Sequence, residues 1–219
     1  SFESPSLITT IQQNAFEECT SLEQIIIPSS VTTIDKAAFN GCSSLILISF
    51  EPPSKLISIG PFAFCDCSSL MSISIPSSVN SIAPNCFNGC LQMKQIVFES
   101  PSNLTIIDYN TFYKCSSLGQ ITIPSSITSI GLSAFEGCTS LENVEILTPS
   151  SLISICNYSF CGCEKLTQIT IPSTVKEIGE NSFKNCRSLT KIIIDPYNTK
   201  IKINSFENCT SLNHLIFGP

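Results

Sequence analysis

Thirteen cysteines and one histidine, His214, are the side chains in this 219-residue sequence whose types could do chemistry at neutral pH. Thiolates and imidazoles are zinc ligands, and a thiolate is also a nucleophile or a redox centre. Cys65 and Cys67 form the pair CDC, and Cys161 and Cys163 form the pair CGC, so each pair offers half of a tetrahedral zinc site. Where the chain places these thiols decides whether they react.

Nine of the cysteines belong to a repeating unit, which we call a coil and number from the N-terminus. In each coil the cysteine follows a phenylalanine by three residues, and the phenylalanines recur at intervals of 23 or 25 residues. The phenylalanines are Phe16, Phe39, Phe64, Phe87, Phe112, Phe135, Phe160, Phe183 and Phe206, and the cysteines are Cys19, Cys42, Cys67, Cys90, Cys115, Cys138, Cys163, Cys186 and Cys209. A period of this length indicates a solenoid.

The regular position of these nine cysteines predicts free, buried thiols. Sulfurs in successive coils should stack roughly 5 Å apart, but their identical orientation disfavours the dihedral angle of a disulfide. The two CxC pairs are separated by four coils, a distance of roughly 20 Å that prevents them from sharing one zinc ion. We therefore predict no metal and no cofactor.

Four cysteines lie outside this column, namely Cys65, Cys86, Cys156 and Cys161. Cys65 and Cys161 directly follow the phenylalanine, at a position filled in other coils by Glu, Asn, Tyr or Lys. We therefore predict that these two thiols are exposed and open to reaction. A redox or metal-binding protein that uses the extra cysteines is one functional hypothesis, and the least favoured.

A catalytic role has little support in the sequence. His214 lies in the last coil, and no Cys or Ser stands in a recognisable nucleophile motif. Glu142 and Glu145 are close together, but outward neighbours on a regular strand are usually solvated. The sequence also lacks a glycine-rich phosphate loop. We predict that the protein is not an enzyme.

The residues after each cysteine predict the strands that position these columns. The segment typically reads LxxIxI, and a spacing of two between apolar residues indicates a strand, with Ile25 and Ile27 pointing inward in coil 1. Strands at the same point of every coil must pair in parallel. The expected strand centres are Ile25, Ile48, Ile73, Ile96, Ile121, Val144, Ile169, Ile192 and Leu215.

Turns and links complete each coil. Two residues after the phenylalanine stands a Gly or Asn in six coils, which predicts a short helical turn closed by a left-handed residue. On the far arc, pairs such as Val31 and Ile34 direct two apolar residues into the core. Narrow links such as IPSSV (27–31) alternate with wide links such as FEPPSKL (50–56) and FESPSNL (98–104), which gives a higher period of 48 residues.

The predicted fold class is therefore an α/β repeat solenoid: a right-handed arc of about nine coils, with one continuous parallel β-sheet and short helical turns. We expect residues 1–219 to form a single solenoid domain and to be an excerpt of a longer array, since both ends resemble cuts through the repeat. The core residues are exemplified by Phe39, Cys42 and Leu45 in coil 2 and by Phe112, Cys115 and Leu118 in coil 5.

This unit, written IGxxAFxGCxSLxxIxIPSSV, resembles the BspA-like leucine-rich repeats over essentially the whole chain. The departures are local: Met93 replaces Leu, Leu215 replaces the strand Ile, and Asn198 occupies an apolar link position. The resemblance implies an arc-shaped solenoid, often found on the surfaces of mucosal bacteria and protozoa, where it is associated with adhesion to host protein or to other cells.

Charge limits the partners that the protein can bind. Only 13% of residues are charged and the net charge is −6, which argues against nucleic acid, because nucleic-acid binding requires clustered Lys and Arg. No apolar run approaches the length of a membrane span. The favoured partner is therefore a protein, bound at a cell surface or after secretion. Two alternatives stay open: the protein contacts glycans or extracellular matrix, or it is a cytoplasmic scaffold for protein–protein interaction.

The outward strand positions are the residues that the repeat leaves free to vary, and we expect the partner to bind there. Amides at these positions can donate and accept hydrogen bonds without requiring a charged partner. The predicted binding residues are Gln95, Gln120, Asn143, Gln168, Lys191 and His214 in one row, and Thr122, Glu145 and Thr170 in the next. There are two alternatives: these residues only keep the sheet soluble, or the partner binds the wide links, where EPPSK (51–55), ESPSN (99–103) and LTPSS (147–151) form a second repeating edge.

Overall fold

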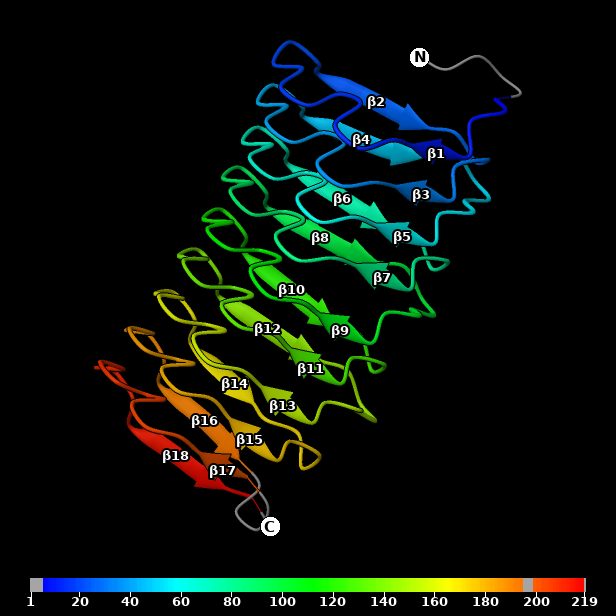
Figure 1. The fold of residues 1–219 in the computed structure, drawn as a ribbon. Helices are drawn as coiled ribbons and strands as arrows, with labels where there is room; N and C mark the ends of the chain where they lie inside the picture. Colours follow the sequence, from blue (N-terminus) through cyan, green and yellow to red (C-terminus); the bar gives the residue numbers. More distant parts are fainter. Residues whose placement is uncertain (1–5, 195–198, 219) are drawn as a thin grey trace.

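The protein is a solenoid whose coils stack along one axis. The computed structural model describes residues 6–194 and 199–218, and Asn198, where the repeat pattern is broken, lies outside them. Figure 1 shows the coils following one another from the N-terminus to the C-terminus, with each coil adding one strand to each of two sides. In the described part of the chain, no helix is long and apolar enough to cross a membrane.

Strands of three or four residues form the first side, which we call the sheet face. They are β2 (Gln24–Ile27), β4 (Leu47–Phe50), β6 (Ser72–Ile75), β8 (Gln95–Phe98), β10 (Gln120–Ile123), β12 (Asn143–Ile146), β14 (Gln168–Thr170), β16 (Lys191–Ile194) and β18 (His214–Phe217). Each predicted strand centre lies within one of them, and their pairings are all parallel. This part of the fold prediction is confirmed.

Two-residue strands form the second side, where the sequence predicted only an inward pair of apolar residues. They are β1 (Thr10–Ile11), β3 (Thr33–Ile34), β5 (Ser58–Ile59), β7 (Ser81–Ile82), β9 (Ile106–Ile107), β11 (Ser129–Ile130), β13 (Ser154–Ile155), β15 (Glu177–Ile178) and β17 (Lys200–Ile201). They also pair in parallel, so most neighbouring coils are joined by strand pairing on two sides.

The single continuous sheet that we expected is divided on both sides at the same level. On the sheet face the strand order is β2-β4-β6-β8, followed by a separate β10-β12-β14-β16-β18. The second side is divided between β7 and β9. Both divisions lie between coils 4 and 5.

The wide links explain this division. When the first coil of a pair has a narrow link, as in β2–β4 and β10–β12, four residues of each strand are paired. When the first coil has a wide link, as in β4–β6 and β12–β14, only one residue of each strand is paired. The last strand residue before a wide link is half-buried, as in Phe50, Phe98 and Ile146. The last strand residue before a narrow link is buried, as in Ile27, Ile75 and Ile123. The two additional residues of a wide link thus lead the chain away from the next coil, and between β8 and β10 the pairing is lost.

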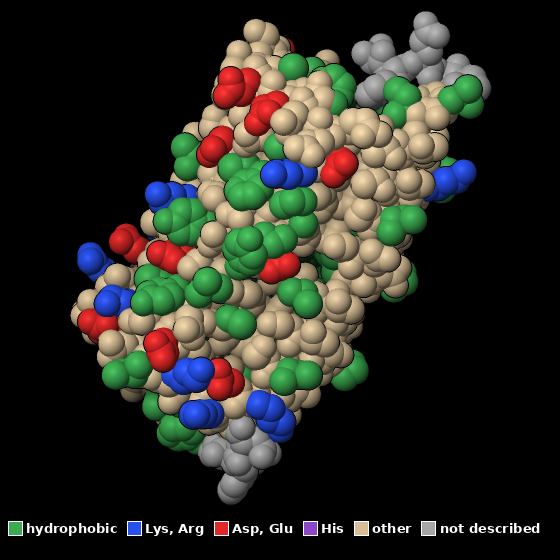
Figure 2. Space-filling view, in the orientation of Figure 1, with side chains coloured by type: hydrophobic (Ala, Val, Ile, Leu, Met, Phe, Trp, Pro, Cys, Tyr) green, Lys and Arg blue, Asp and Glu red, His purple; other side chains and the backbone are tan. Residues whose placement is uncertain are grey.

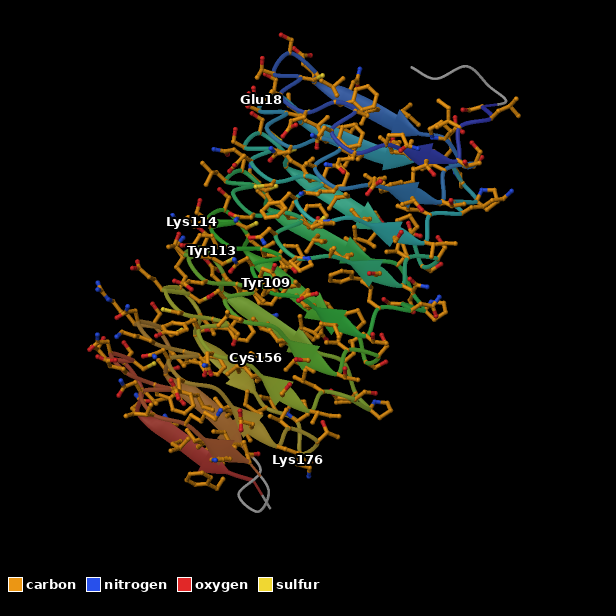
Figure 3. The ribbon with its side chains drawn as sticks, in the orientation of Figure 1. Glu18, Tyr109, Tyr113, Lys114, Cys156 and Lys176 are labelled. Atoms are coloured by element: carbon orange, nitrogen blue, oxygen red, sulfur yellow. The ribbon has the colours of Figure 1, made fainter. Side chains whose placement is uncertain are left out.

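The segment around each phenylalanine consists of successive turns rather than a helix. The predicted left-handed residue is present in all nine coils, from Glu18 and Lys114 (Figure 3) to Gly41. A second left-handed residue lies two positions before each phenylalanine, and the sequence analysis missed it. Alternate N–H groups donate to the next coil, as Phe39 N does to Ala63 O at 2.8 Å. Because these N–H groups bond to carbonyls of the next coil, they are not available for the hydrogen bonds of an α-helix.

The core is a stack of phenylalanine rings. Neighbouring ring centroids are 5.0–5.6 Å apart and nearly parallel along the whole column. The six residues chosen to represent the core are fully buried, namely Phe39, Cys42, Leu45, Phe112, Cys115 and Leu118. This stack continues across the division between coils 4 and 5, so it holds together the two halves whose strands do not pair.

The column thiols are free, as predicted, and all of them except those of the two terminal coils are buried. Each described sulfur from coil 2 onward donates to the phenylalanine carbonyl of the preceding coil; Cys115 Sγ, for example, lies 3.2 Å from Phe87 O. The thiols therefore serve as weak hydrogen-bond donors between coils as well as apolar filling.

Candidate binding surface and its groove

The structure brings most of the predicted binding residues together in two rows on the sheet face. The first row consists of residues that lie opposite one another on adjacent strands, without a break in register: Gln120, Asn143, Gln168, Lys191 and His214. Gln95 belongs to the same column but lies across the division, on β8. The amides and His214 are exposed, whereas Lys191 is half-buried.

In the second row, Thr122, Glu145 and Thr170 are exposed, and two of them contact each other. Thr122 Oγ1 donates a hydrogen bond of 3.0 Å to Glu145 Oε2 across the β10–β12 pair. At the end of the first row, His214 Nδ1 lies 2.6 Å from Asn213 Oδ1. Both contacts fix the orientation of polar groups that face solvent.

A groove of about 550 Å³ lies at the division between β8 and β10. Its lining includes Gln95, Gln120 and Asn143 from the first row, together with Thr122 and Glu145 from the second. Phe98 at the end of β8 also lines it, and the links supply Glu99, Ser100, Pro101, Ser102, Pro124, Ser125, Ser126 and Leu147. Figure 2 shows hydrophobic and acidic side chains intermixed midway along the stack.

The groove follows from the alternation of link lengths. Coil 5 has a narrow link, and it lies between the wide links of coils 4 and 6, which supply Glu99 and Leu147. The site prediction preferred the strand residues and kept the wide-link segments ESPSN (99–103) and LTPSS (147–151), which contain Glu99 and Leu147, only as its alternative; it missed the narrow-link residues Pro124, Ser125 and Ser126. The signal for them is the period of 48 residues, because a short link between two long ones leaves room for a notch where no side chain of the longer links fills it.

A second, shallower hollow of about 450 Å³ adjoins the groove at the other end of the same strands. It shares Gln120 and Asn143 with the groove and is otherwise lined by Lys94, Ser117, Gly119, Ser140 and Glu142. The two hollows together run along the direction of β10.

The cysteines outside the column do not form a reactive site. The prediction that Cys65 is exposed is wrong: it is 7% exposed, and burial together with the neighbouring Asp66 carboxylate raises the pKa of its thiol to about 12. Cys161 is half-buried, and burial and Glu136 raise the pKa of its thiol. Because the position after the phenylalanine is covered by neighbouring coils, these thiols stay protonated at neutral pH.

Cys156 (Figure 3) is half-buried beside Ser129, with 3.7 Å between Sγ and Oγ. Among residues 6–194 and 199–218, no group of three or more His, Cys, Asp or Glu could hold a metal ion. Glu142 lies 3.9 Å from Lys165 Nζ, an exposed ion pair on the sheet face. The arrangement of this surface therefore suits binding through hydrogen bonds and shape.

Parallel strands, a stacked core and an exposed sheet define a leucine-rich-repeat solenoid, and solved structures agree. A leucine-rich repeat protein from Bacteroides ovatus is 26% identical with a TM-score of 0.71, over 94% of this chain and 57% of that one. A leucine-rich repeat protein of T. pallidum is 26% identical with a TM-score of 0.60, over 75% and 74% of the chains. The pneumococcal vaccine antigen PcpA has the same fold at 24% identity and a TM-score of 0.65, over 89% and 63%.

The sequence matches the family described as "BspA type Leucine rich repeat region (6 copies)" over residues 1–116, 46–148 and 144–219. The chain therefore belongs to the BspA-type leucine-rich repeat family, as its repeat unit suggested. It spans 57% of the Bacteroides ovatus protein and 63% of PcpA. No curated protein matches it significantly.

Proposed function

We propose that this chain is a non-catalytic module that binds a protein partner across the sheet face, centred on the groove between β8 and β10. One observation carries the proposal: the groove lies in the predicted rows and is lined by Gln95, Gln120 and Asn143. Solenoids of this kind commonly use an extended face for binding. The weak charge of the chain favours recognition through amides and apolar contacts.

Binding is tested with the purified protein on an array of host cell-surface and extracellular-matrix proteins. Each protein that binds is measured again with the triple variant Gln95→Ala, Gln120→Ala and Gln168→Ala. We expect the triple variant to lose at least tenfold in affinity, about 1.4 kcal/mol. The control replaces three exposed amides away from the sheet face, Gln12, Gln13 and Asn80, with Ala. Equal affinity of the two triple variants, at unchanged melting temperature, would refute binding by the sheet face.

The favoured location for this binding is the cell surface. We propose it from the resemblance to surface adhesion repeats, and labelling of intact, unpermeabilised cells with an antibody to the solenoid tests it. Labelling that appears only after the cells are permeabilised would contradict a surface role.

An intracellular scaffold is the second candidate, and a specific observation favours it. All thirteen cysteines are free, whereas proteins in oxidising compartments usually carry disulfides. Burial of the column thiols weakens this argument, because a buried thiol is protected from oxidants in any compartment. Recovery of the native protein from the soluble fraction of disrupted cells would support the scaffold.

A further inference from the structure

The charge of the groove has one sign only. Among the described residues that line it, Glu99 and Glu145 are the charged ones, and there is no Lys, Arg or His. Glu99 Oε1 accepts a hydrogen bond of 3.1 Å from Ser74 Oγ, and Glu145 Oε2 accepts one from Thr122 Oγ1. These hydroxyl groups orient the carboxylates but leave their negative charge unbalanced, since neither forms a salt bridge within the described residues.

Apolar side chains lie beside these carboxylates. Val97 is 42% exposed and Leu147 is 39% exposed, and Phe98, which also lines the groove, is half-buried. A side chain with an apolar stem and a cationic head, that is, Lys or Arg, can cover such a surface and still reach a carboxylate. The groove thus offers carboxylates for the head of a basic side chain, and apolar surface for its stem and for an apolar residue beside it.

The shape of the surface suits an extended polypeptide. The groove and the adjoining hollow share Gln120 and Asn143 and lie at opposite ends of β10, so a chain lying along this strand would occupy both. The two shared amides can each donate to and accept from a peptide backbone. At the hollow end, Lys94 and Glu142 present charges of both signs.

We propose that the groove receives an extended segment of the partner polypeptide, with a Lys or Arg seated between Glu99 and Glu145 and an apolar residue next to it against Val97 and Leu147. This inference rests on the proposed function and specifies the chemistry of the partner. Binding would then depend on salt concentration, because the ion pairs lie near the surface.

The test uses a library of random peptides of about eight residues, which span about 26 Å when extended. The library is selected on the purified wild-type protein, and the affinities of the recovered peptides are then measured for Glu99→Gln and Glu145→Gln. Glutamine keeps the size of the side chain and its ability to accept the hydroxyl hydrogen bond. Glu23→Gln is the matched control, since Glu23 is exposed and lies in coil 1, away from the groove.

We expect the selected peptides to share a Lys or Arg beside an apolar residue. Each groove variant should weaken their binding by roughly 3- to 10-fold, and the control should leave it unchanged. The inference is overturned if no peptide binds, if the selected peptides lack a shared basic residue, or if both groove variants bind as tightly as the wild type. Such a result would leave the array experiment unaffected, because that experiment tests binding by the sheet face with the triple variant Gln95→Ala, Gln120→Ala and Gln168→Ala.

Discussion

Ser182 provides a sharp test of the core packing, because its replacement by alanine should stabilise the protein. Its side chain is fully buried, and within the described structure its hydroxyl oxygen has no hydrogen-bond partner. The same position, directly before the phenylalanine, holds fully buried alanines in coils 2, 3 and 6, namely Ala38, Ala63 and Ala134. A methyl group therefore fits this site without rearrangement of the neighbouring coils.

The expected gain follows from the cost of burying a polar group. An unpaired buried hydroxyl costs about 1–3 kcal/mol, and Ser182→Ala removes it without changing the backbone. We expect the free energy of unfolding to rise by about 1–2 kcal/mol, and the melting temperature by about 2–4 °C for each kcal/mol in a chain of this size. Ser159 is buried and unpaired in the same way, so Ser159→Ala should give a similar gain.

Urea unfolding followed by far-ultraviolet circular dichroism measures this gain, with Ser205→Ala as the control. Ser205 occupies the same position in coil 9, but its Oγ lies 2.6 Å from Lys202 O and 2.9 Å from Gly179 O, so its single O–H has a carbonyl acceptor. Its replacement should therefore destabilise the protein by about 1 kcal/mol. If Ser182→Ala instead destabilises the protein as much as Ser205→Ala, the Ser182 hydroxyl is hydrogen-bonded and the reasoning is refuted.

Three further predictions concern the scaffold. Gly131→Ala should destabilise the protein by about 1–3 kcal/mol in urea unfolding, because the new Cβ would lie 2.7 Å from a backbone carbon of the preceding coil. The control Gly119→Ala should be neutral, because no atom lies within 4 Å of the position of its Cβ. Phe62 has a φ of 59°, so Phe62→Asn should raise the melting temperature by relieving about 1 kcal/mol of strain; a lower value would show that its ring packing matters more. Burial and Asp66 raise the pKa of the Cys65 thiol from 9.0 to about 12. Because this thiol ionises at a lower pH in the unfolded chain than in the folded protein, the free energy of unfolding measured in urea should fall above about pH 9. The fall should be smaller in Cys65→Ala.

The sequence predicted the elements that obey the repeat, since every coil supplies an independent copy of the same pattern. Nine phenylalanines at matching offsets determined the strand centres, and Gly or Asn in six coils identified the left-handed residue after the phenylalanine. The left-handed residue before it carried an equal signal, because Asn occupies that position in five coils: Asn14, Asn85, Asn110, Asn181 and Asn204. Phe62 and Tyr158 at the same position obscured it.

What could not be predicted depends on contacts between coils. The exposure of Cys65 was inferred from the residue types at its position, but its burial is set by how closely the neighbouring coils cover that position. The loss of pairing between β8 and β10 likewise depends on how two coils lie at a wide link, because β4–β6 and β12–β14 still pair across theirs. The rows of the binding surface were predicted and the wide links were kept as an alternative edge, whereas the groove where rows and links meet depends on contacts between coils and was not predicted.

The same link alternation that leaves a notch at coil 5 should also leave one at coil 3, yet the two differ. At coil 3 the wide link of coil 4 reaches back, since Glu99 accepts a hydrogen bond from Ser74 and Asn103 Nδ2 donates to Ser77 O at 2.9 Å.

In the wide link of coil 6, Leu147 and Ser151 occupy the positions of these bridging side chains. Leu147 cannot accept a hydrogen bond, and within the described residues Ser125 O receives its hydrogen bond from the backbone N–H of Ser151, at 3.0 Å, instead of from a side chain. The narrow link of coil 5 is thus bonded to coil 6 through the backbone, without the carboxylate and amide side chains that lie over coil 3. A repeat scaffold can vary its surface in this way, by changing two side chains of one link while the phenylalanine stack continues unchanged.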